Sequence, residues 1–285
     1  MVVYLNGEWL PAEDACVSVF DRGFMFGDSV YEVVPVYGAR PFRQAQHMAR
    51  LRASMVAAGM DLGRFTGDWN GIFYRLIEDL GPGDGTIYLQ VTRGVAPRQH
   101  AFPAHVPLTV FAYARRKAAD PYKRGSGGIS AVVLDDIRWA RCDIKSTALI
   151  ANVLLVQEAL RRGADEAILV RSDVVTEGAV SNVFVLKDGV LLTAPCSSFI
   201  LGGITRDVVQ ELARRADIPI QERAPTRIEL LTADEVLITS SSWEVAAVTQ
   251  LDLQPVGTGL PGPVFMRLFD AFQAFKDEVR MGTRV

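Results

Sequence analysis

The sequence predicts an α+β fold in two parts, and three observations support this prediction. Residues 1–117 alternate strand-like and helix-like patterns, whereas residues 127–285 consist mostly of short strand patterns separated by turn residues. The segment 115–128, RRKAADPYKRGSGG, combines charged residues, one proline and three glycines, as linkers do. We therefore expect a sandwich-like N-terminal α+β domain (1–117), a linker at 118–126, and a C-terminal domain (127–285) with a closed or half-closed barrel-like sheet and flanking helices.

The first part should begin with a β-hairpin over residues 1–11, because Asn6-Gly7 is a favoured two-residue turn. A second hairpin is expected over 29–42, with Gly38 in its turn. The other elements expected in this part are helices at 43–60 and 68–81 and strands at 85–94 and 107–116.

The second part should begin with a strand over 128–144, which is rich in β-branched residues and leads directly to Lys145. Helical spacing follows at 146–163, with Ser146 or Thr147 as the N-cap and Gly163 at the end. The residues expected on the apolar face of this helix are Leu149, Val153, Val156 and Leu160.

A meander of strands is expected over 166–195, with Glu177 in a tight turn and Asp188-Gly189 closing a hairpin. Residues 200–218 predict a strand or loop that enters a helix capped by Thr205. The chain then returns to strand over 234–256 and ends in a helix.

Composition excludes several classes of function. The net charge of −3 gives no electrostatic footprint for nucleic acid. The sequence shows neither a secretory leader nor an apolar run of the ~20 residues needed to cross a bilayer, so we expect a soluble cytoplasmic protein. A metal site is not expected, since the three cysteines and three histidines are scattered: Cys16, Cys142, Cys196, His47, His100 and His105.

Lys145 is the first candidate for chemistry. A lysine in water is protonated and inert, so burial or a cationic neighbour, such as Arg138 or Arg141, would have to lower its pKa. The amine is most useful as a Schiff base with the aldehyde of pyridoxal phosphate, a cofactor that also needs a carboxylate at its ring nitrogen and an anion site for its phosphate. Taken alone, Lys145 is better explained as an ordinary solvated lysine than as a catalytic one.

The other requirements are present, although each has a simpler explanation. Glu177 could pair with a pyridinium or could be an exposed turn carboxylate. The glycine pair 202–203 precedes a helix start, where the amides of Ile204 and Thr205 could meet a phosphate. The hydroxyls of residues 239–242, which include Ser240 and Ser241, could donate hydrogen bonds to the same phosphate. The guanidinium of Arg50 could supply a positive charge to it.

Six motifs in order make the combination specific. They are FDRGFMFGDSVYE (20–32), HMARLRAS (47–54), DIRWARCDIKS (136–146), EAILVRSDVVTEGAVSNVF (166–184), GITRDVV (203–209) and VLITSSSWE (236–244). Together they resemble the fold-type IV pyridoxal-phosphate enzymes over nearly the whole chain. That family includes branched-chain and D-amino-acid aminotransferases, aminodeoxychorismate lyases and R-selective amine transaminases.

The resemblance implies a role for each candidate. Lys145 would be the Schiff-base lysine and proton shuttle, and Glu177 would contact the pyridine nitrogen. Leu201 would lie against the cofactor ring. The residues implied around the phosphate are Arg50, Ile204, Thr205, Ser240 and Ser241. The family fold also implies a homodimer of two-domain subunits, with each active site near the subunit interface.

The loop at 88–103 suggests the substrate. Arg98 and His100 are two residues apart, so in an extended segment both can face one side and bind a carboxylate. A polar surface loop is the alternative. The surrounding PRxHxFP pattern resembles the D-amino-acid aminotransferases, in which such an arginine and histidine reach the partner's active site and, with a tyrosine (here Tyr31), hold the substrate α-carboxylate.

This resemblance implies a ping-pong transamination of D-alanine and 2-oxoglutarate to pyruvate and D-glutamate. Ala179 and Val180 replace more polar residues expected after Glu177, and Trp139 and Trp243 are bulky beside the implied pocket. These departures bear on substrate range rather than on reaction type.

Five alternatives remain at this stage. A branched-chain L-aminotransferase typically has a GTA-type segment where this chain has TSSSWE, and an R-amine transaminase has little use for a carboxylate clamp. A lyase would turn over one substrate without an amino acceptor. A pyridoxal-phosphate carrier would need no substrate clamp, and an α+β protein without cofactor would be colourless.

Overall fold

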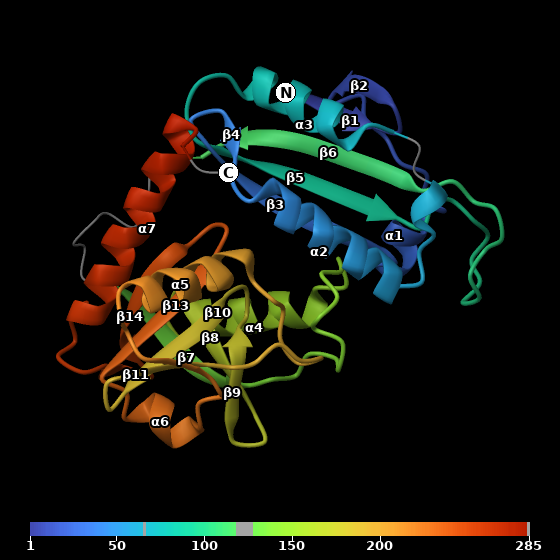
Figure 1. Ribbon diagram of the computed structural model, residues 1–285. Helices are drawn as coiled ribbons and strands as arrows, with labels where there is room; N and C mark the ends of the chain where they lie inside the picture. The colour runs from blue at the N-terminus through green and yellow to red at the C-terminus, as the bar shows by residue number, and fades with distance from the viewer. Residues whose placement is uncertain (65–66, 118–127, 284–285) are drawn as a thin grey trace. The chain divides into compact units, whose positions relative to one another are not determined.

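The computed structural model describes residues 1–64, 67–117 and 128–283 (Figure 1). Contacts divide the chain into two compact units. Unit 1 comprises Met1–Ala119, Ile144–Ala148 and Asp277–Val285, and unit 2 comprises Asp120–Asp143 and Leu149–Lys276. Lys145 therefore packs with unit 1. The expected linker at 118–126 lies outside the described residues, and the expected domain limits stay a prediction.

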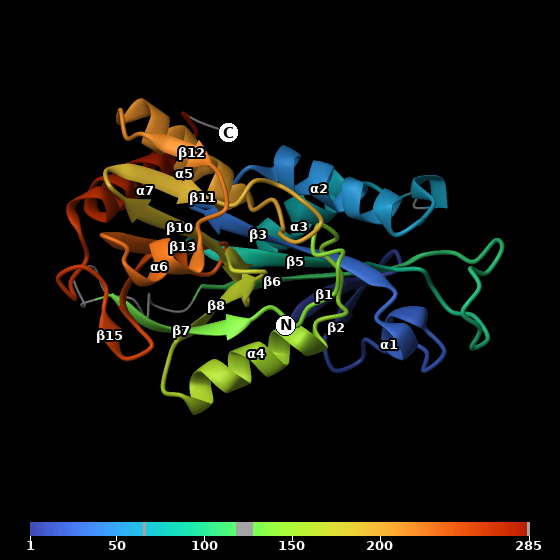
Figure 2. The same cartoon turned by 90° about the horizontal axis from the view of Figure 1, so that it is seen from below.

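Unit 1 is built on a six-stranded antiparallel sheet in the order β2-β1-β6-β5-β3-β4. Its strands are β1 (Val2–Leu5), β2 (Glu8–Pro11), β3 (Ser29–Tyr37), β4 (Arg40–Pro41), β5 (Gly85–Thr92) and β6 (Thr109–Arg116). Its helices are α1 (Arg22–Phe26), α2 (Gln44–Ala57), the 3-10 turn η1 (Leu62–Arg64) and α3 (Trp69–Leu80). Helices α2 and α3 cover one face of this sheet (Figure 2), because their apolar residues share one buried cluster with alternate valines of β3.

The predicted elements of unit 1 are confirmed. Asn6 and Gly7 have φ values of 51° and 100°, as a type I′ hairpin turn requires, and Leu5 pairs with Glu8 across it. Gly38, with a φ of 56°, lies in the turn between β3 and β4. Both long helices and the strands β5 and β6 fall within the predicted ranges.

Unit 2 contains a nine-stranded mixed sheet in the order β12-β11-β10-β13-β14-β7-β8-β9, with β15 paired to β14. Its strands are β7 (Ile129–Asp135), β8 (Glu166–Arg171), β9 (Val174–Gly178), β10 (Asn182–Lys187), β11 (Val190–Thr193), β12 (Ile220–Glu222), β13 (Glu235–Ser240), β14 (Glu244–Leu251) and β15 (Gln254–Pro255). Its helices are α4 (Ile150–Arg161), α5 (Ile204–Arg215), α6 (Arg227–Leu231) and most of α7 (Pro263–Met281). In the described chain the end strands β12 and β9 do not pair, so the sheet is a half-barrel.

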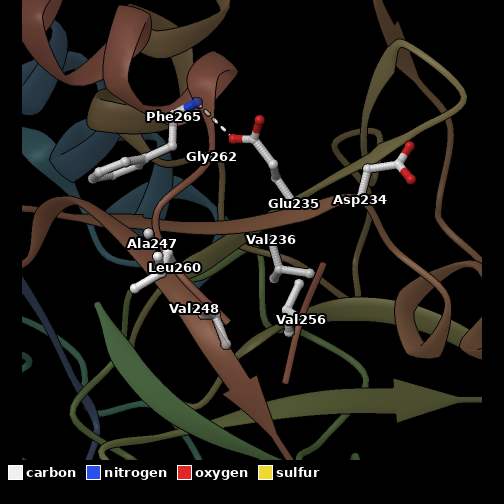
Figure 3. Close-up of a pocket in the computed structure, with 9 residues that line it drawn as sticks. All are labelled: Asp234, Glu235, Val236, Ala247, Val248, Val256, Leu260, Gly262 and Phe265. Atoms are coloured by element: carbon white, nitrogen blue, oxygen red, sulfur yellow. Dashed lines mark hydrogen bonds between the residues drawn. The ribbon is translucent and has the colours of Figure 1, made fainter. Parts of the chain in front are cut away.

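One small cavity in unit 2 lies between β13, β14 and the start of α7 (Figure 3). Glu235 at its edge accepts hydrogen bonds from the amides of Val264 and Phe265, at 2.9 and 2.7 Å, and so caps α7. None of the predicted site residues lines this cavity.

The segment around Lys145 differs from the sequence prediction. Strand β7 ends at Asp135, and irregular chain runs from there to Leu149, the N-cap of α4, which makes no side-chain cap bond. Ser146 and Thr147 are therefore not caps. Thr147 instead hydrogen-bonds to Ser29 at the start of β3. Lys145 thus lies on a long loop rather than at a strand-to-helix junction.

The predicted apolar face of α4 is wrong in part, since of the helical residues predicted for it only Val156 packs against the buried cluster. Its buried residues are Leu155 and Ala159, whereas Val153 and Leu160 are 51% and 55% exposed. The helix does end as predicted, with Gly163 at a φ of 75° just after it. Helical spacing alone did not identify the buried side, since apolar residues lie all round this helix.

Two further local predictions are corrected. Glu177 lies within strand β9 and is buried rather than in an exposed turn. The N-cap of α5 is Gly203, which places Thr205 inside the first turn. The Asp188-Gly189 hairpin is confirmed, with φ values of 49° and 76°.

No helix among the described residues is long and apolar enough to cross a membrane. In the same ranges, no group of three or more His, Cys, Asp or Glu side chains is arranged to hold a metal ion.

Candidate active site

Strand β3 fixes the position of Lys145 in unit 1. The Tyr31 amide donates to the Lys145 carbonyl at 3.0 Å, and the Lys145 amide donates to Ser54 Oγ on α2 at 3.2 Å. The lysine Nζ lies 4.2 Å from the centre of the Tyr31 ring. Within the described chain this half-buried amine forms no hydrogen bond or ion pair, so its nitrogen is not engaged by another side chain and is accessible for reaction.

Next to Tyr31 on the same strand, Glu32 forms a buried charged cluster with two residues of α2. Arg50 Nε and Nη2 donate to the two carboxylate oxygens of Glu32 at 2.7 and 2.8 Å, and His47 Nδ1 lies 2.8 Å from one of them. The Glu32 side chain is fully buried, and that of Arg50 is 14% exposed. The cluster therefore holds Arg50 in one orientation.

The pKa values in this cluster follow from its geometry. Burial alone would raise the pKa of Glu32, but the charges and hydrogen bonds of Arg50 and His47 lower it to about 2. Burial lowers the pKa of His47 against the opposing effect of Glu32. His47 is therefore neutral at pH 7 and donates through Nδ1–H, which leaves Nε2 as an acceptor. That atom is buried and has no partner in the described chain.

Arg98 and His100 lie on the exposed loop between β5 and β6. Their side chains make no hydrogen bond or ion pair with any residue in the described ranges. Both contact the ring of Phe26 on α1, so they do share one side, as the sequence predicts. Among the described residues of unit 1, neither is hydrogen-bonded to Tyr31.

In unit 2, Glu177 is the centre of a second buried cluster. Arg138 donates to one of its oxygens, while Asn182 Nδ2 and the Leu201 amide donate to the other at 3.0 and 2.9 Å. Asp136 binds Arg138 from the opposite side through two oxygens at 2.9 Å. Burial raises the pKa of Glu177 to about 7, and Arg138 limits the rise.

The start of α5 lies beside this cluster. Asn182 Nδ2 also donates to the Leu201 carbonyl at 2.8 Å. A Cβ on Gly203 would stand 2.0 Å from Asn182 Oδ1, so only glycine fits there. This N-cap has no side chain to satisfy the first amides of the helix, which belong to the buried residues Ile204 and Thr205.

Hydroxyls at the end of β13 complete this region. Thr239 faces Asn182 across the β10–β13 ladder, and its buried Oγ1 lacks a partner in the described chain. Ser240 and Ser241 follow it and are half-buried, and Ser240 Oγ accepts from the Trp243 amide at 3.0 Å.

The structure therefore groups the predicted residues into two sets. Unit 1 brings Lys145, Tyr31 and Arg50 together around β3. Unit 2 brings Glu177, Leu201 and the start of α5 together around Asn182. Arg138 and Arg141, considered as cationic neighbours of the lysine, pair with carboxylates instead: Arg138 with Glu177 and Asp136, Arg141 with Asp143.

The residues that support these sets are not predicted from the sequence. Glu32, His47 and Ser54 lie inside motifs already recognised, but their side chains act on residues of other elements. The available signal was a glutamate inside a valine-rich strand, because a carboxylate buried in such a strand must find a cation. Asn182 gave no signal beyond its place in the TEGAVSN motif.

Comparison with known proteins decides the family. The model of the amino-transferase class IV family matches residues 29–251, most of the chain. The chain belongs to the class IV aminotransferases. All of Lys145, Glu177 and Arg50 lie within the matched segment of this aminotransferase.

Curated relatives of this class IV aminotransferase cover nearly its full length. A D-alanine aminotransferase of Bacillus licheniformis is 42% identical over 273 residues, covering 96% of each chain. One of Staphylococcus epidermidis is 41% identical over 274 residues, covering 96% of this chain and 97% of that one.

Solved structures confirm the α+β fold-type IV architecture. The branched-chain amino acid aminotransferase of Escherichia coli matches with a TM-score of 0.86 at 29% identity, covering 96% of this chain and 93% of that one. A branched-chain amino acid aminotransferase of T.th., solved with pyridoxamine 5'-phosphate, matches with a TM-score of 0.87 at 27% identity, covering 99% of this chain and 95% of that one.

The residues of unit 2 suit the cofactor of this family. A buried carboxylate held by three donors can face a ring N–H. Three features of this region suit a phosphate: the start of α5 has no side-chain cap, Gly203 leaves room where a Cβ would collide with Asn182, and the Thr239 hydroxyl has no partner in the described chain. The donor set therefore fits pyridoxal 5'-phosphate.

Proposed function

We propose that this class IV aminotransferase uses pyridoxal 5'-phosphate to transfer the amino group of D-alanine to 2-oxoglutarate, giving pyruvate and D-glutamate. The observation that carries the substrate assignment is the 40–42% identity to D-alanine aminotransferases over 96% of the chain. The branched-chain enzymes among the solved structures are 26–29% identical to this chain. The D-amino-acid assignment is therefore favoured over the branched-chain alternative.

Each set of site residues has a proposed role. Bound pyridoxal 5'-phosphate supplies an aldehyde that accepts the amino group and a ring that withdraws electrons from the substrate Cα. Lys145 Nζ would hold that aldehyde between turnovers, and the same amine would carry the substrate Cα proton. Glu177 keeps the ring nitrogen protonated, and Leu201 packs against the ring. The groups proposed to hold the phosphate are Arg50, the amides of Ile204 and Thr205, and the hydroxyls of Ser240 and Ser241.

The substrate carboxylate is assigned to Arg98, His100 and Tyr31. A guanidinium and an imidazole that have no hydrogen-bond partner in the described chain are free to bind a carboxylate with charge-assisted hydrogen bonds. Fixing the carboxylate determines which bond at Cα faces Lys145 and thereby which enantiomer reacts.

We also propose that the enzyme is a homodimer in which the Arg98 loop of one subunit completes the site of the other. The exposed side chains of Arg98 and His100, which pair with no described residue, support the proposal. The three cysteines are free, which is consistent with the reducing cytoplasm that we propose as its location.

A coupled assay of D-alanine and of L-alanine with 2-oxoglutarate tests the function. We expect pyruvate from D-alanine only, with strict dependence on the oxo acid. Preference for L-leucine over D-alanine would instead support a branched-chain aminotransferase. Pyruvate released from a single substrate without an amino acceptor would indicate a lyase.

A further inference from the structure

The ring of Phe26, the last residue of α1, contacts both side chains of the proposed carboxylate clamp. The guanidinium carbon of Arg98 is 5.2 Å from the ring centre, and the His100 ring centre is 5.6 Å from it with a tilt of 50°. These distances are within the range of cation–π and edge-type aromatic contacts. A single ring therefore fixes the separation and the direction of both side chains.

Arg22, in the first turn of the same helix, fixes the backbone of the loop. Its Nη1 donates to the Gln99 carbonyl at 2.5 Å and to the Ala101 carbonyl at 3.4 Å, on either side of His100. Its guanidinium carbon lies 4.8 Å from the centre of the Phe26 ring. Arg22 is only 3% exposed, so its position is determined by the fold.

Asp28 connects this arginine to Arg93, at the start of the loop. It accepts from Arg22 Nε at 2.8 Å and from Arg93 Nε and Nη2 at 2.7 and 3.0 Å. Arg93 in turn lies 3.7 Å from the centre of the Phe102 ring, two residues beyond His100. Buried charges are retained only when they are paired, and these pairs hold the loop at three points.

We propose that Phe26 is a positioning residue for the substrate carboxylate, which it serves by holding Arg98 and His100 in their binding orientation, and that Arg22 supports it by fixing the loop backbone. An exposed arginine has many rotamers, and ordering it on binding costs free energy. Ordering it beforehand on an aromatic ring removes part of that cost. This inference rests on the proposed function, because it takes the clamp to bind a carboxylate.

The test replaces the ring of Phe26 in the holoenzyme. For Phe26→Leu we expect the KM for D-alanine and the Kd for 2-oxoglutarate, measured by titration calorimetry, to rise about 3- to 10-fold. We expect kcat to stay within about two-fold. Phe26→Tyr, which keeps the aromatic face, should restore both constants. The control is Phe24→Leu, on the same helix at a 72% exposed position, which should change neither constant.

A second readout separates this role from a general structural one. Aminooxyacetate carries a carboxylate and hydroxylamine carries none, and the reaction of each with the holoenzyme changes the cofactor absorbance. Phe26→Leu should slow the reaction with aminooxyacetate and leave that with hydroxylamine unchanged. Equal slowing of both reactions would overturn the inference.

Arg98→Ala distinguishes this inference from the proposed function. If Arg98→Ala raises the KM and Phe26→Leu does not, the positioning role fails while the clamp stands. If neither raises it, the clamp fails and the inference with it. Should Phe26→Leu not yield folded protein, Arg22→Lys tests the inference instead. This variant keeps the positive charge but loses the guanidinium that binds the Gln99 and Ala101 carbonyls. An unchanged Kd for 2-oxoglutarate in that variant would overturn the inference.

Discussion

Glu32 and Arg50 form a two-point ion pair between β3 and α2, with both carboxylate oxygens engaged at 2.7 and 2.8 Å and the glutamate fully buried. The pair is adjacent to Tyr31 on the strand, and Tyr31 contacts Lys145. The same strand therefore orients the proposed phosphate-binding arginine, the proposed carboxylate-binding tyrosine and the loop of the lysine. Loss of Glu32 should consequently affect both stability and cofactor retention.

We expect Glu32→Gln to destabilise the protein by about 3 kcal/mol, because it leaves the Arg50 guanidinium without its buried counter-charge. The affinity for pyridoxal 5'-phosphate should fall as Arg50 loses its fixed orientation. Urea unfolding and equilibrium dialysis measure the two effects. Glu158→Gln is the control, since Glu158 pairs with Arg161 and Arg162 on the surface of α4, and no measurable change is expected.

The Glu32 effect should depend on pH in one direction. The pKa of Glu32 is about 2 in the folded protein, below its ordinary value of 4.5. The stabilisation is therefore complete above pH 4.5 and is lost as pH falls towards 2. The stability difference between wild type and Glu32→Gln should be constant from pH 7 to 5 and shrink below 4.5. A difference that grows on acidification would contradict the assignment.

Lys145→Ala should abolish turnover, a loss of at least about 10³-fold, because it removes the group proposed to move the Cα proton. It should also abolish the absorbance change of the holoenzyme on borohydride treatment. Lys187→Ala is the matched control, since Lys187 Nζ donates to the Thr232 carbonyl at 2.7 Å in an exposed hydrogen bond and this lysine is not among the proposed site residues. Turnover retained by Lys145→Ala would refute the central role of this lysine.

The secondary structure could be predicted best from the sequence where it depends on a few neighbouring residues. The Asn6-Gly7 and Asp188-Gly189 hairpins depend on two residues each, and both are confirmed. The surroundings of Lys145 could not be predicted, because they depend on Ser54 and Tyr31, distant in the chain. Its loop lacks regular structure, and the β-branched residues before it continue the strand pattern beyond Asp135.

The candidate site shows the same division between local and distant determinants. Motifs could indicate Glu177 but not its burial, which depends on Arg138 and the Leu201 amide arriving from other loops. The role of Glu32 could not be predicted, because its cation comes from α2 and no local spacing in the sequence marks the pair. The two-residue spacing of Arg98 and His100 did predict a shared side, and the loop supplies it against Phe26.

Arg98→Ala should raise the KM for D-alanine and for 2-oxoglutarate by about 10-fold or more, the loss of a charge-assisted carboxylate contact worth about 1.5–3 kcal/mol. Cofactor content, measured by absorbance, should be unchanged, because Arg98 is not among the residues proposed to hold the cofactor. Arg52→Ala removes an exposed charge from α2 and serves as the control. A loss of cofactor in Arg98→Ala, or an unchanged KM, would argue against the carboxylate clamp.

Glu166 gives a pH prediction of the opposite sign to that of Glu32. It lies at the start of β8, is 1% exposed, and accepts from the Ala167 amide and from Ser181 Oγ, both at 2.9 Å. Burial raises the pKa of Glu166 to about 7, and the hydrogen bonds only partly oppose this. Its ionisation therefore opposes folding, and the free energy of unfolding decreases as pH rises from 4.5 to 7.

We expect the stability of wild type relative to Glu166→Gln to fall by up to about 3 kcal/mol between pH 4.5 and 7 and to level off above that range. Urea unfolding of both proteins at pH 5, 6, 7 and 8 measures this difference. Glu229→Gln is the control, because Arg223 lowers the pKa of Glu229 to about 2, so its difference curve should be flat throughout. Parallel stability curves for wild type and Glu166→Gln between pH 5 and 7 would show that this carboxylate is already ionised in the fold, with Ser181 and the neighbouring amides sufficient to hold its charge.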